Sequence, residues 1–172
     1  MEILLLGNEL LGQKALAVKH IGPEYQQIAA DLIQTLHDGK GIGLAGPQVG
    51  RMERIFAVHI EGDVPRIFIN PSIIETSKEM NKYEEGCLSI PGLYADVIRH
   101  QNIKIQAWNE FGRPFTLEAG GLLARVILHE YDHLEGVLFI DRVPEEKKNR
   151  LLMKYNKSSH KEGRQKRGRY KI

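Results

Sequence analysis

The segment HEYDH at residues 129–133 places two histidines four residues apart, with an acid directly after the first. On a helix, His129 and His133 would stand one turn apart on the same face, close enough to bind a single ion. Glu130 would lie on the adjoining face, within reach of a water on that ion. This arrangement is typical of metal-assisted hydrolysis, in which the ion acidifies the water and the carboxylate carries its proton.

The alternative for these histidines is an ordinary helix in which both rings are simply hydrogen-bonded. The surrounding sequence, GGLLARVILHEYDHLEG at 120–136, is largely apolar. Burying two imidazoles and a carboxylate in such a helix is costly unless something compensates them. The flanking residues therefore favour the metal hypothesis.

The third ligand decides the class of site. A metzincin-type protease would supply a further histidine where this chain has Phe139. A thermolysin-like protease would supply a glutamate about twenty residues onward on a second helix, but Glu145 and Glu146 come too soon and Glu162 lies in a basic segment. Cys87, in YEEGCLSIPG, remains as the candidate.

A Cys87 thiolate with two neutral imidazoles would leave one coordination position open, which is the catalytic pattern. Two other interpretations stay open here. A lone cysteine is often a small buried hydrophobe. A closed structural site would instead need a fourth protein ligand, for which Glu85 or Asp132 is available.

Hydrophobic spacing predicts the elements that position these residues. Residues 22–41 and 120–136 have helical spacing, and a last, exposed helix is predicted to begin near Pro144. The glycine-rich stretch GIGLAGPQVG at 41–50 is interpreted as a loop. Short runs rich in Ile, Phe and Val predict strands at 54–60, 65–70, 102–109 and 112–117, the last two forming a hairpin.

No helix-length crossover separates these strands, which favours antiparallel sheets and the α+β class. We expect the sheets to pack around the central metal-binding helix, with an N-terminal helix and a C-terminal helix or tail. At 172 residues the chain is long enough for one domain and too short for two comfortable ones. We expect a catalytic region over 1–146 and a basic helix or tail over 147–172.

Charge is distributed unevenly between these two regions. Residues 147–172 contain eleven Lys or Arg and one acid, a charge of +10, so a chain of net charge +2 leaves −8 for residues 1–146. A basic tail on an acidic body favours a polyanionic partner such as nucleic acid. The alternative is a solvated terminus without a partner.

The remaining composition points to a cytoplasmic protein. The start, MEILLLGNELLG, has no basic leader or cleavage-type ending, and no segment is long enough to span a bilayer. Cys87 is the single cysteine, so an internal disulfide is impossible.

The chain strongly resembles the peptide deformylases. Three motifs carry the resemblance in the family's order and spacing: GIGLAGPQ at 41–48, EGCLS at 85–89 and HEYDH at 129–133. The likeness covers about the first 143 residues. It implies an enzyme that removes the N-terminal formyl group from formyl-methionyl nascent peptides and releases formate.

The resemblance also implies roles for individual residues. Cys87, His129 and His133 would ligate a divalent metal, with water in the fourth position. Glu130 would deprotonate that water and then protonate the leaving amine. The family usually uses Fe(II), and the ligand types also admit Zn, Ni or Co.

The same resemblance implies that the Gln48 side-chain amide and the Leu88 backbone N–H stabilise the developing oxyanion. The alternative role for Gln48 is to brace the glycine loop alone. The peptide would add as an extended strand near Ile42, Gly43 and Gly86. Val126 would line the pocket for the methionine side chain.

Three positions depart from the family's usual pattern: Gly46 stands where Ala is more common, Tyr94 where a basic residue is frequent, and Arg125 where the residue is commonly apolar. Two further functions stay open from the sequence, namely a metallopeptidase cleaving internal bonds and a nucleic-acid-binding module with a structural metal. For a deformylase, the tail at 147–172 would bind ribosomal RNA.

Overall fold

The computed structural model describes residues 1–167, with side chains described through residue 157. A five-stranded sheet has the order β1-β2-β3-β6-β7, and β4 and β5 form a second sheet; all their pairings are antiparallel. The strands are β1 (Gly43–Ala45), β2 (Ile55–Val58), β3 (Arg66–Thr76), β4 (Met80–Cys87), β5 (Ile90–His100), β6 (Asn102–Trp108) and β7 (Pro114–Gly120). The helices are α1 (Glu24–Asp38), α2 (Gly121–Leu134) and α3 (Glu145–Arg167), and 3-10 turns occur at η1 (Glu9–Gly12), η2 (Gly46–Val49) and η3 (Phe139–Arg142). The predicted α+β class is confirmed.

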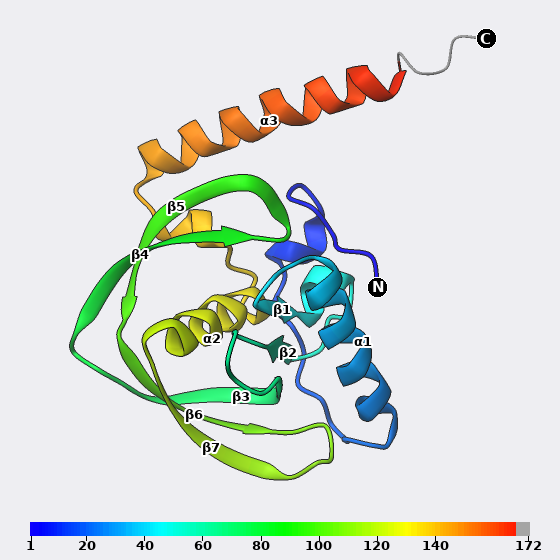
Figure 1. Cartoon of the computed structure of the whole chain (residues 1–172), viewed down its shortest axis with the longest axis vertical. Coiled ribbons are helices and arrows are strands. Elements are labelled where there is room, and N and C mark those ends of the chain that lie inside the picture. Colours follow the sequence, from blue (N-terminus) through cyan, green and yellow to red (C-terminus); the bar gives the residue numbers. More distant parts are fainter. Residues whose placement is uncertain (168–172) are drawn as a thin grey trace.

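Helix α2 lies in the middle of the molecule, with the β4–β5 sheet on one side and β3, β6 and β7 on the other (Figure 1). Nine of its fourteen residues are buried. Five of the nine are polar or charged, so each needs a partner in the interior. The helix ends before Gly136, whose φ of 71° is the left-handed conformation that favours glycine after a helix.

The β6–β7 hairpin forms as its alternating pattern predicts. Ile103, Ile105 and Ala107 face the core, and the Asn109 N–H donates to the Arg113 carbonyl across the turn. Phe56 and Phe68, from the neighbouring strands β2 and β3, stack with ring centroids 4.7 Å apart in the same core. This core supports one face of α2.

Two parts of the sheet structure differ from the sequence prediction. The stretch 41–50 is not wholly a loop, because Gly43–Ala45 forms β1 and pairs with β2, and Gly46–Val49 forms η2. The strands β4 and β5 were not expected at all. Strand β4 has only one buried residue, the charged Glu85, so it lacks the apolar alternation that marks a strand in sequence.

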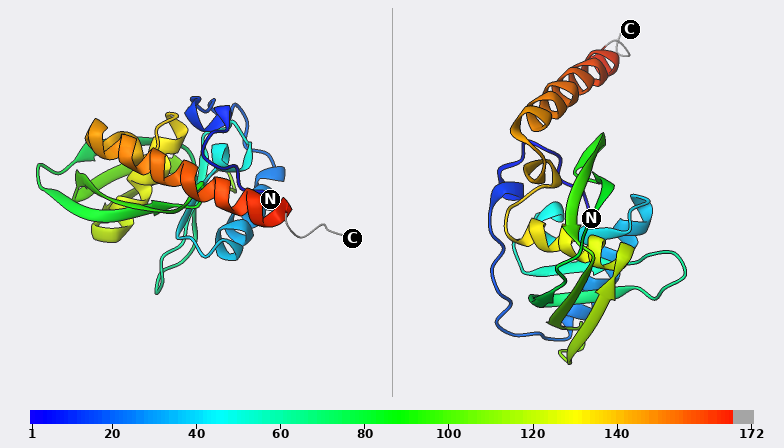
Figure 2. Two further views of the ribbon diagram at one scale, coloured as in Figure 1. Left: turned by 90° about the horizontal axis from the view of Figure 1, so that it is seen from above. Right: turned by 90° about the vertical axis from the view of Figure 1, so that its left-hand side faces the viewer.

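The first and last helices flank this arrangement. Helix α1 falls inside the predicted range, with Leu32 and Leu36 fully buried. Helix α3 begins where predicted, packs its early residues Leu151 and Leu152 against a core cluster beside β5, and extends away from the body toward its C-terminal end (Figure 2). Residues 168–172 of the predicted basic tail lie outside the described residues. Over residues 1–167, no helix combines the length and apolar character needed to cross a bilayer.

Candidate metal centre

Three side chains from two elements converge beside α2. Cys87 is the last residue of β4, and His129 and His133 stand one turn apart on α2. One ligand atom from each lies within 4.8 Å of the other two, and Cys87 Sγ is 3.3 Å from His133 Nε2. The structure thus brings together the three residues that the sequence selected, across 42 positions of chain between Cys87 and His129.

The orientation of the His129 ring is set by a neighbouring carboxylate. His129 Nδ1 is 2.8 Å from Glu85 Oε2. Burial opposes ionisation of Glu85, but hydrogen bonds from His129 and Arg99 outweigh it and lower the pKa to about 2. Because an ionised carboxylate only accepts, Nδ1 carries the proton, and the other ring nitrogen can face an ion.

The two imidazoles differ in their electrostatics. Burial, followed by the charge of His129, lowers the pKa of His133 well below its usual value, so this ring is neutral as a ligand must be. Burial also disfavours the charged form of His129, but hydrogen bonds with Cys87 and Glu85 prevail and raise its pKa to about 10. A divalent cation would compete with that proton. One thiol sulfur and two ring nitrogens form a donor set that fits a borderline transition ion.

Glu130 lies next to this cluster without a partner for one of its oxygens. Its side chain is 3% exposed, and Oε2 has no hydrogen bond to the described part of the chain. Burial raises the pKa of Glu130 to about 7, against the opposing charge of His129. A buried carboxylate oxygen with no partner is costly unless it serves a ligand.

Gln48 reaches the cluster from η2. Its Oε1 accepts from the Ala45 N–H at 2.8 Å, which holds the glycine-rich stretch, and its Nε2 lies 3.4 Å from Cys87 Sγ and 3.2 Å from Ser89 Oγ. The amide therefore braces the stretch with one end and faces the candidate ligands with the other. Leu88 lies in the turn after β4, outside the register of the β4–β5 ladder.

A cavity of about 500 Å³ opens onto these groups. It is lined by all four residues predicted to bind substrate, together with most of the cluster: Ile42, Gly43, Gly86, Val126, Gln48, Cys87, Leu88, His129 and Glu130. Leu122 also lines the cavity and is 46% exposed, which adds an apolar side chain to this wall.

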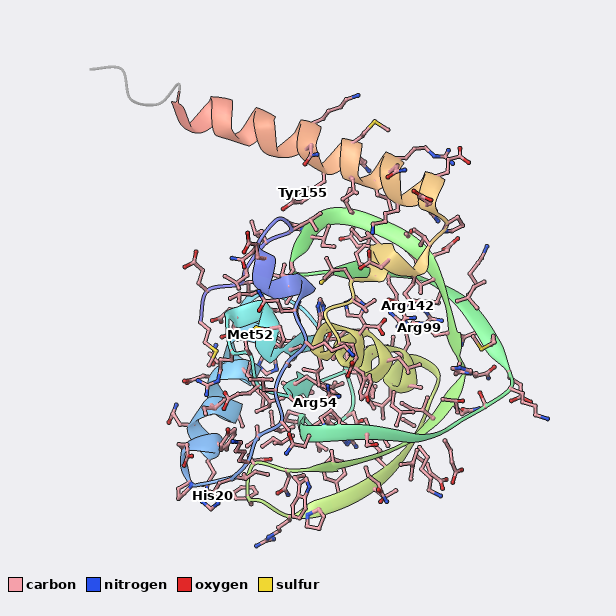
Figure 3. The ribbon with its side chains drawn as sticks, turned by 180° about the vertical axis from the view of Figure 1, so that it is seen from behind. His20, Met52, Arg54, Arg99, Arg142 and Tyr155 are labelled. Carbon is pink, nitrogen blue, oxygen red and sulfur yellow. The ribbon has the colours of Figure 1, made fainter. Side chains whose placement is uncertain are left out.

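The sequence did not reveal the buried ion-pair network behind the cluster. Glu85 forms ion pairs with Arg99 and Arg125, each at 2.6 Å, and Arg99 binds both of its oxygens. Asp132 forms ion pairs with Arg99 at 2.8 Å and with Arg142 at 2.5 Å. Figure 3 shows Arg99 and Arg142 together beside α2. Within the described residues the group that could hold a metal consists of Cys87, His129 and His133 and includes neither Glu85 nor Asp132. The alternative of a closed structural site with a fourth protein ligand therefore has no support. Of this network, the sequence showed only the acid of the EGCLS motif, Glu85, and gave no sign that it is buried.

A Cys-His-His donor set between β4 and the buried helix α2 has a cavity in front of it and, beside it, a carboxylate with one oxygen unpaired among the described residues; these features define a metal-dependent hydrolase. A profile of the polypeptide deformylase family matches residues 1–149. The chain therefore belongs to the peptide deformylase family.

Relatives from several organisms agree with this assignment. The peptide deformylase of Borreliella burgdorferi is 45% identical over 156 residues, covering 90% of this chain and 94% of the relative. That of Treponema pallidum (strain Nichols) is 41% identical over 155 residues, covering 90% and 95%. Among solved structures, the Synechococcus elongatus peptide deformylase in complex with actinonin has a TM-score of 0.86 and 42% identity, covering 91% of this chain and 86% of its own. The Ehrlichia chaffeensis enzyme has a TM-score of 0.88 and 30% identity, covering 94% and 98%.

Family membership answers the question of function class. The protein is a metal-dependent hydrolase that removes the formyl group from nascent peptides, as the motifs predicted. Neither the metallopeptidase nor the nucleic-acid-binding module is supported by the family or the relatives.

Proposed function

We propose that Cys87, His129 and His133 hold one divalent ion and that Glu130 moves the protons during removal of the formyl group. One observation carries this assignment. The three ligand atoms lie within 4.8 Å of one another, and the adjacent Glu130 keeps a buried oxygen that has no hydrogen bond to any of the described residues. Both features are what a site for an ion and a water molecule needs.

The chemistry divides between the ion and the protein. The ion, when bound, supplies a Lewis acid that polarises the formyl carbonyl and acidifies water. Glu130 takes a proton from the water molecule while the oxygen of that water forms a bond to the formyl carbon. When the C–N bond breaks, Glu130 gives the proton to the departing nitrogen, and the products are formate and a free amino terminus.

Two donors are proposed for the negative oxygen that develops on the formyl carbon. Gln48 Nε2 faces the cluster, and its other end is fixed by the Ala45 N–H. Leu88 would donate its backbone N–H from the turn after β4. Donors that are already oriented stabilise the transition state without reorganisation.

The substrate backbone is proposed to add beside β1. This strand lies at the edge of the five-stranded sheet, next to β2, and Ile42 and Gly43 at this edge line the cavity. Gly86 would contact the peptide from the opposite wall, and Val126 would contact the methionine side chain. Backbone pairing reads no side chains, which suits an enzyme that acts on many nascent chains.

Glu130→Gln tests the proposed role directly. Formate release from formyl-Met-Ala-Ser by anaerobically prepared protein should fall by about 10²- to 10⁴-fold, the usual range for general acid–base catalysis. Bound metal, measured by mass spectrometry, should stay at the wild-type level. Glu118→Gln, on an exposed side chain, is the matched control and should retain full activity. Near-normal turnover by Glu130→Gln would remove Glu130 from the mechanism.

We propose Fe(II) as the ion used in the cell, with Zn, Ni or Co able to occupy the same donors. The thiolate and imidazole ligands favour all four over Mg or Ca. Metal analysis of anaerobically purified protein, followed by reloading with each ion, tests this choice. Iron at about one ion per chain with the highest turnover is expected, and an iron-loaded form less active than the others would contradict it.

Residues 147–172 are proposed to bind ribosomal RNA, which would place the enzyme beside nascent chains in the cytoplasm. The charge of +10 in this segment supports the proposal. Because Leu151 and Leu152 pack on the body, truncation should begin after Lys157. The shortened chain should lose salt-sensitive co-sedimentation with ribosomes and keep turnover of a short formyl peptide. Unchanged co-sedimentation would contradict binding through the removed part of the segment, residues 158–172.

A further inference from the structure

The Glu85 carboxylate is held by four donors from three side chains. Arg99 binds both oxygens, with Nε to Oε1 at 2.6 Å and Nη2 to Oε2 at 2.9 Å. Arg125 Nη1 donates to Oε1 at 2.6 Å, and His129 Nδ1 donates to Oε2 at 2.8 Å. Every strong acceptor position of this carboxylate is therefore used.

Arg125 joins α2 to both strands of the smaller sheet. Besides Glu85 in β4, its guanidinium donates to the Val97 carbonyl in β5 at 3.0 Å and to the backbone and side-chain oxygens of Asn81 in β4. The side chain is 5% exposed. All four N–H groups of the two terminal nitrogens have acceptors, which a lysine ammonium with three donors and no planar fork could not reproduce.

This contact fixes the two elements that carry the candidate ligands. Arg125 and His129 stand one turn apart on α2, and both bind the carboxylate of Glu85. Cys87 lies two residues after Glu85 on the same strand. The distance from the Cys87 sulfur to the imidazoles thus depends on how firmly β4 is held against α2.

We propose that Arg125 is a positioning residue, which acts through Glu85 to hold Cys87 and His129 in ligand geometry and so slows release of the ion. The inference rests on the proposed metal centre. The Arg99 guanidinium cannot replace this contact, because it reaches α2 through Asp132 and not through the Val97 and Asn81 oxygens that Arg125 binds. Removing one partner from a buried charge cluster leaves the other charge uncompensated, so β4 would shift or admit water.

The test measures release of Co(II) from the loaded full-length protein to an excess of chelator, together with the Co(II)–thiolate absorption band. Arg125→Met should release the ion about 10- to 100-fold faster, the usual scale for losing an outer partner of a metal ligand. Arg125→Lys keeps the positive charge but loses the planar guanidinium group, and it should also release Co(II) faster than the wild type. If Arg125→Met does not fold, Arg125→Lys still tests the proposal. The absorption band should shift in both variants.

Arg54→Met is the matched control. Arg54 also contacts α2, because it lies over the Tyr131 ring and donates at 2.6 Å to Glu135, the residue directly after the helix, but it does not touch Glu85. It should lose stability and release Co(II) at the wild-type rate. Equal acceleration in Arg54→Met, or wild-type release by Arg125→Met and Arg125→Lys, would overturn the proposal.

A double-mutant cycle identifies the path of the effect. If Arg125 acts through Glu85, adding Arg125→Met to Glu85→Gln should change the release rate little beyond the single Glu85→Gln variant. Fully additive effects would overturn the route through Glu85. Cys87→Ala distinguishes failure of the underlying site, because wild-type retention of Co(II) in that variant would contradict the proposed ligand set itself.

Discussion

At the scale of single residues, Gln48 shows how one side chain serves structure and chemistry with opposite ends. Gln48→Ala removes the donor that faces the cluster, and we expect kcat for formyl-Met-Ala-Ser to fall by about 10²- to 10³-fold, as for loss of an oxyanion donor. The protein should still fold and retain its metal. Gln34→Ala, on the exposed face of α1, is the control and should be fully active. Near-normal turnover would leave Gln48 with the bracing role alone.

Gly43 makes a second residue-level prediction, because there is no room for a side chain beside Glu130. A Cβ at Gly43 would lie 2.2 Å from Glu130 Oε1 and 2.8 Å from Val126 Cγ1. Gly43→Ala must therefore displace the carboxylate, and kcat should fall by about 10²-fold or more, comparable to losing a general base. Gly12→Ala places its Cβ where nothing lies within 4 Å and should match wild type. Wild-type kinetics in Gly43→Ala would contradict the proposed position of Glu130.

Residue types and spacing predicted the metal-type cluster because those groups have few other uses together. Two histidines one turn apart and a single cysteine already restrict the chemistry. The arginine clamp, in which Arg99 and Arg125 hold the Glu85 carboxylate, could not be predicted in this way. Its arginines lie 14 and 40 positions away along the chain, and a charged residue in sequence does not reveal whether its partner is solvent or another buried charge.

At the scale of elements, the same contrast separates β6 from β4. Ile103, Ile105 and Ala107 alternate with polar residues, so the period of a half-buried strand is visible. The one residue that β4 buries is the charged Glu85, and Arg99 and Arg125, which lie outside this strand, compensate its charge. Strand β1 begins with Gly43, where Glu130 and Val126 approach the backbone too closely for a side chain. Both strands were missed because tertiary contacts, not local hydrophobic pattern, determine their composition.

The attachment of α1 predicts a pH dependence of stability. Tyr25, 5% exposed, donates its hydroxyl to Glu53 Oε1 at 2.6 Å, and burial together with this hydrogen bond raises its pKa to about 12. The fold favours the neutral phenol, so this contribution is complete below the unfolded pKa of about 10. It is lost as pH rises from about 10 through 12.

Tyr25→Phe tests this linkage. At pH 8 the variant should be less stable by about 1.5–3 kcal/mol, the usual scale for a hydrogen bond to a charged acceptor. Above pH 10, urea unfolding of the wild type should lose stability more steeply than the variant, and the two curves should converge. Tyr94→Phe, at an exposed tyrosine, should follow the wild-type slope. Parallel curves for wild type and Tyr25→Phe would contradict the assignment.

At the scale of the whole molecule, the uneven distribution of charge along the chain follows the division of the fold into a body and the last helix, α3. The acidic body encloses the site, and α3 carries the basic segment from a packed beginning to an end that projects away from it (Figure 2). The division at residue 146 stays a prediction, and the packing of Leu151 and Leu152 argues for a functional boundary later in the helix.

The candidate ligands come from both the β4–β5 sheet and helix α2, so we predict that removal of the metal will lower the stability of the fold. Cys87 belongs to the smaller sheet, and both histidines belong to α2, so an ion at these donors cross-links elements that are otherwise joined by the arginine clamp. The unfolded chain separates Cys87 from His129 by 42 positions and offers no such site. An ion that binds only the folded state stabilises it by about 2.7 kcal/mol when its free concentration is 100 times Kd.

Thermal unfolding of the loaded and chelator-stripped protein measures this effect. The stripped wild type should melt at a lower temperature, and readdition of Co(II) or Zn should restore the original midpoint. In Cys87→Ala the gap between the two forms should shrink, because a site with two ligands binds more weakly and the ion contributes less. If the loaded and stripped wild type melt together while metal analysis confirms that the ion was present and then removed, the ion does not cross-link β4 to α2. The arginine clamp would then hold the two elements without help from the metal.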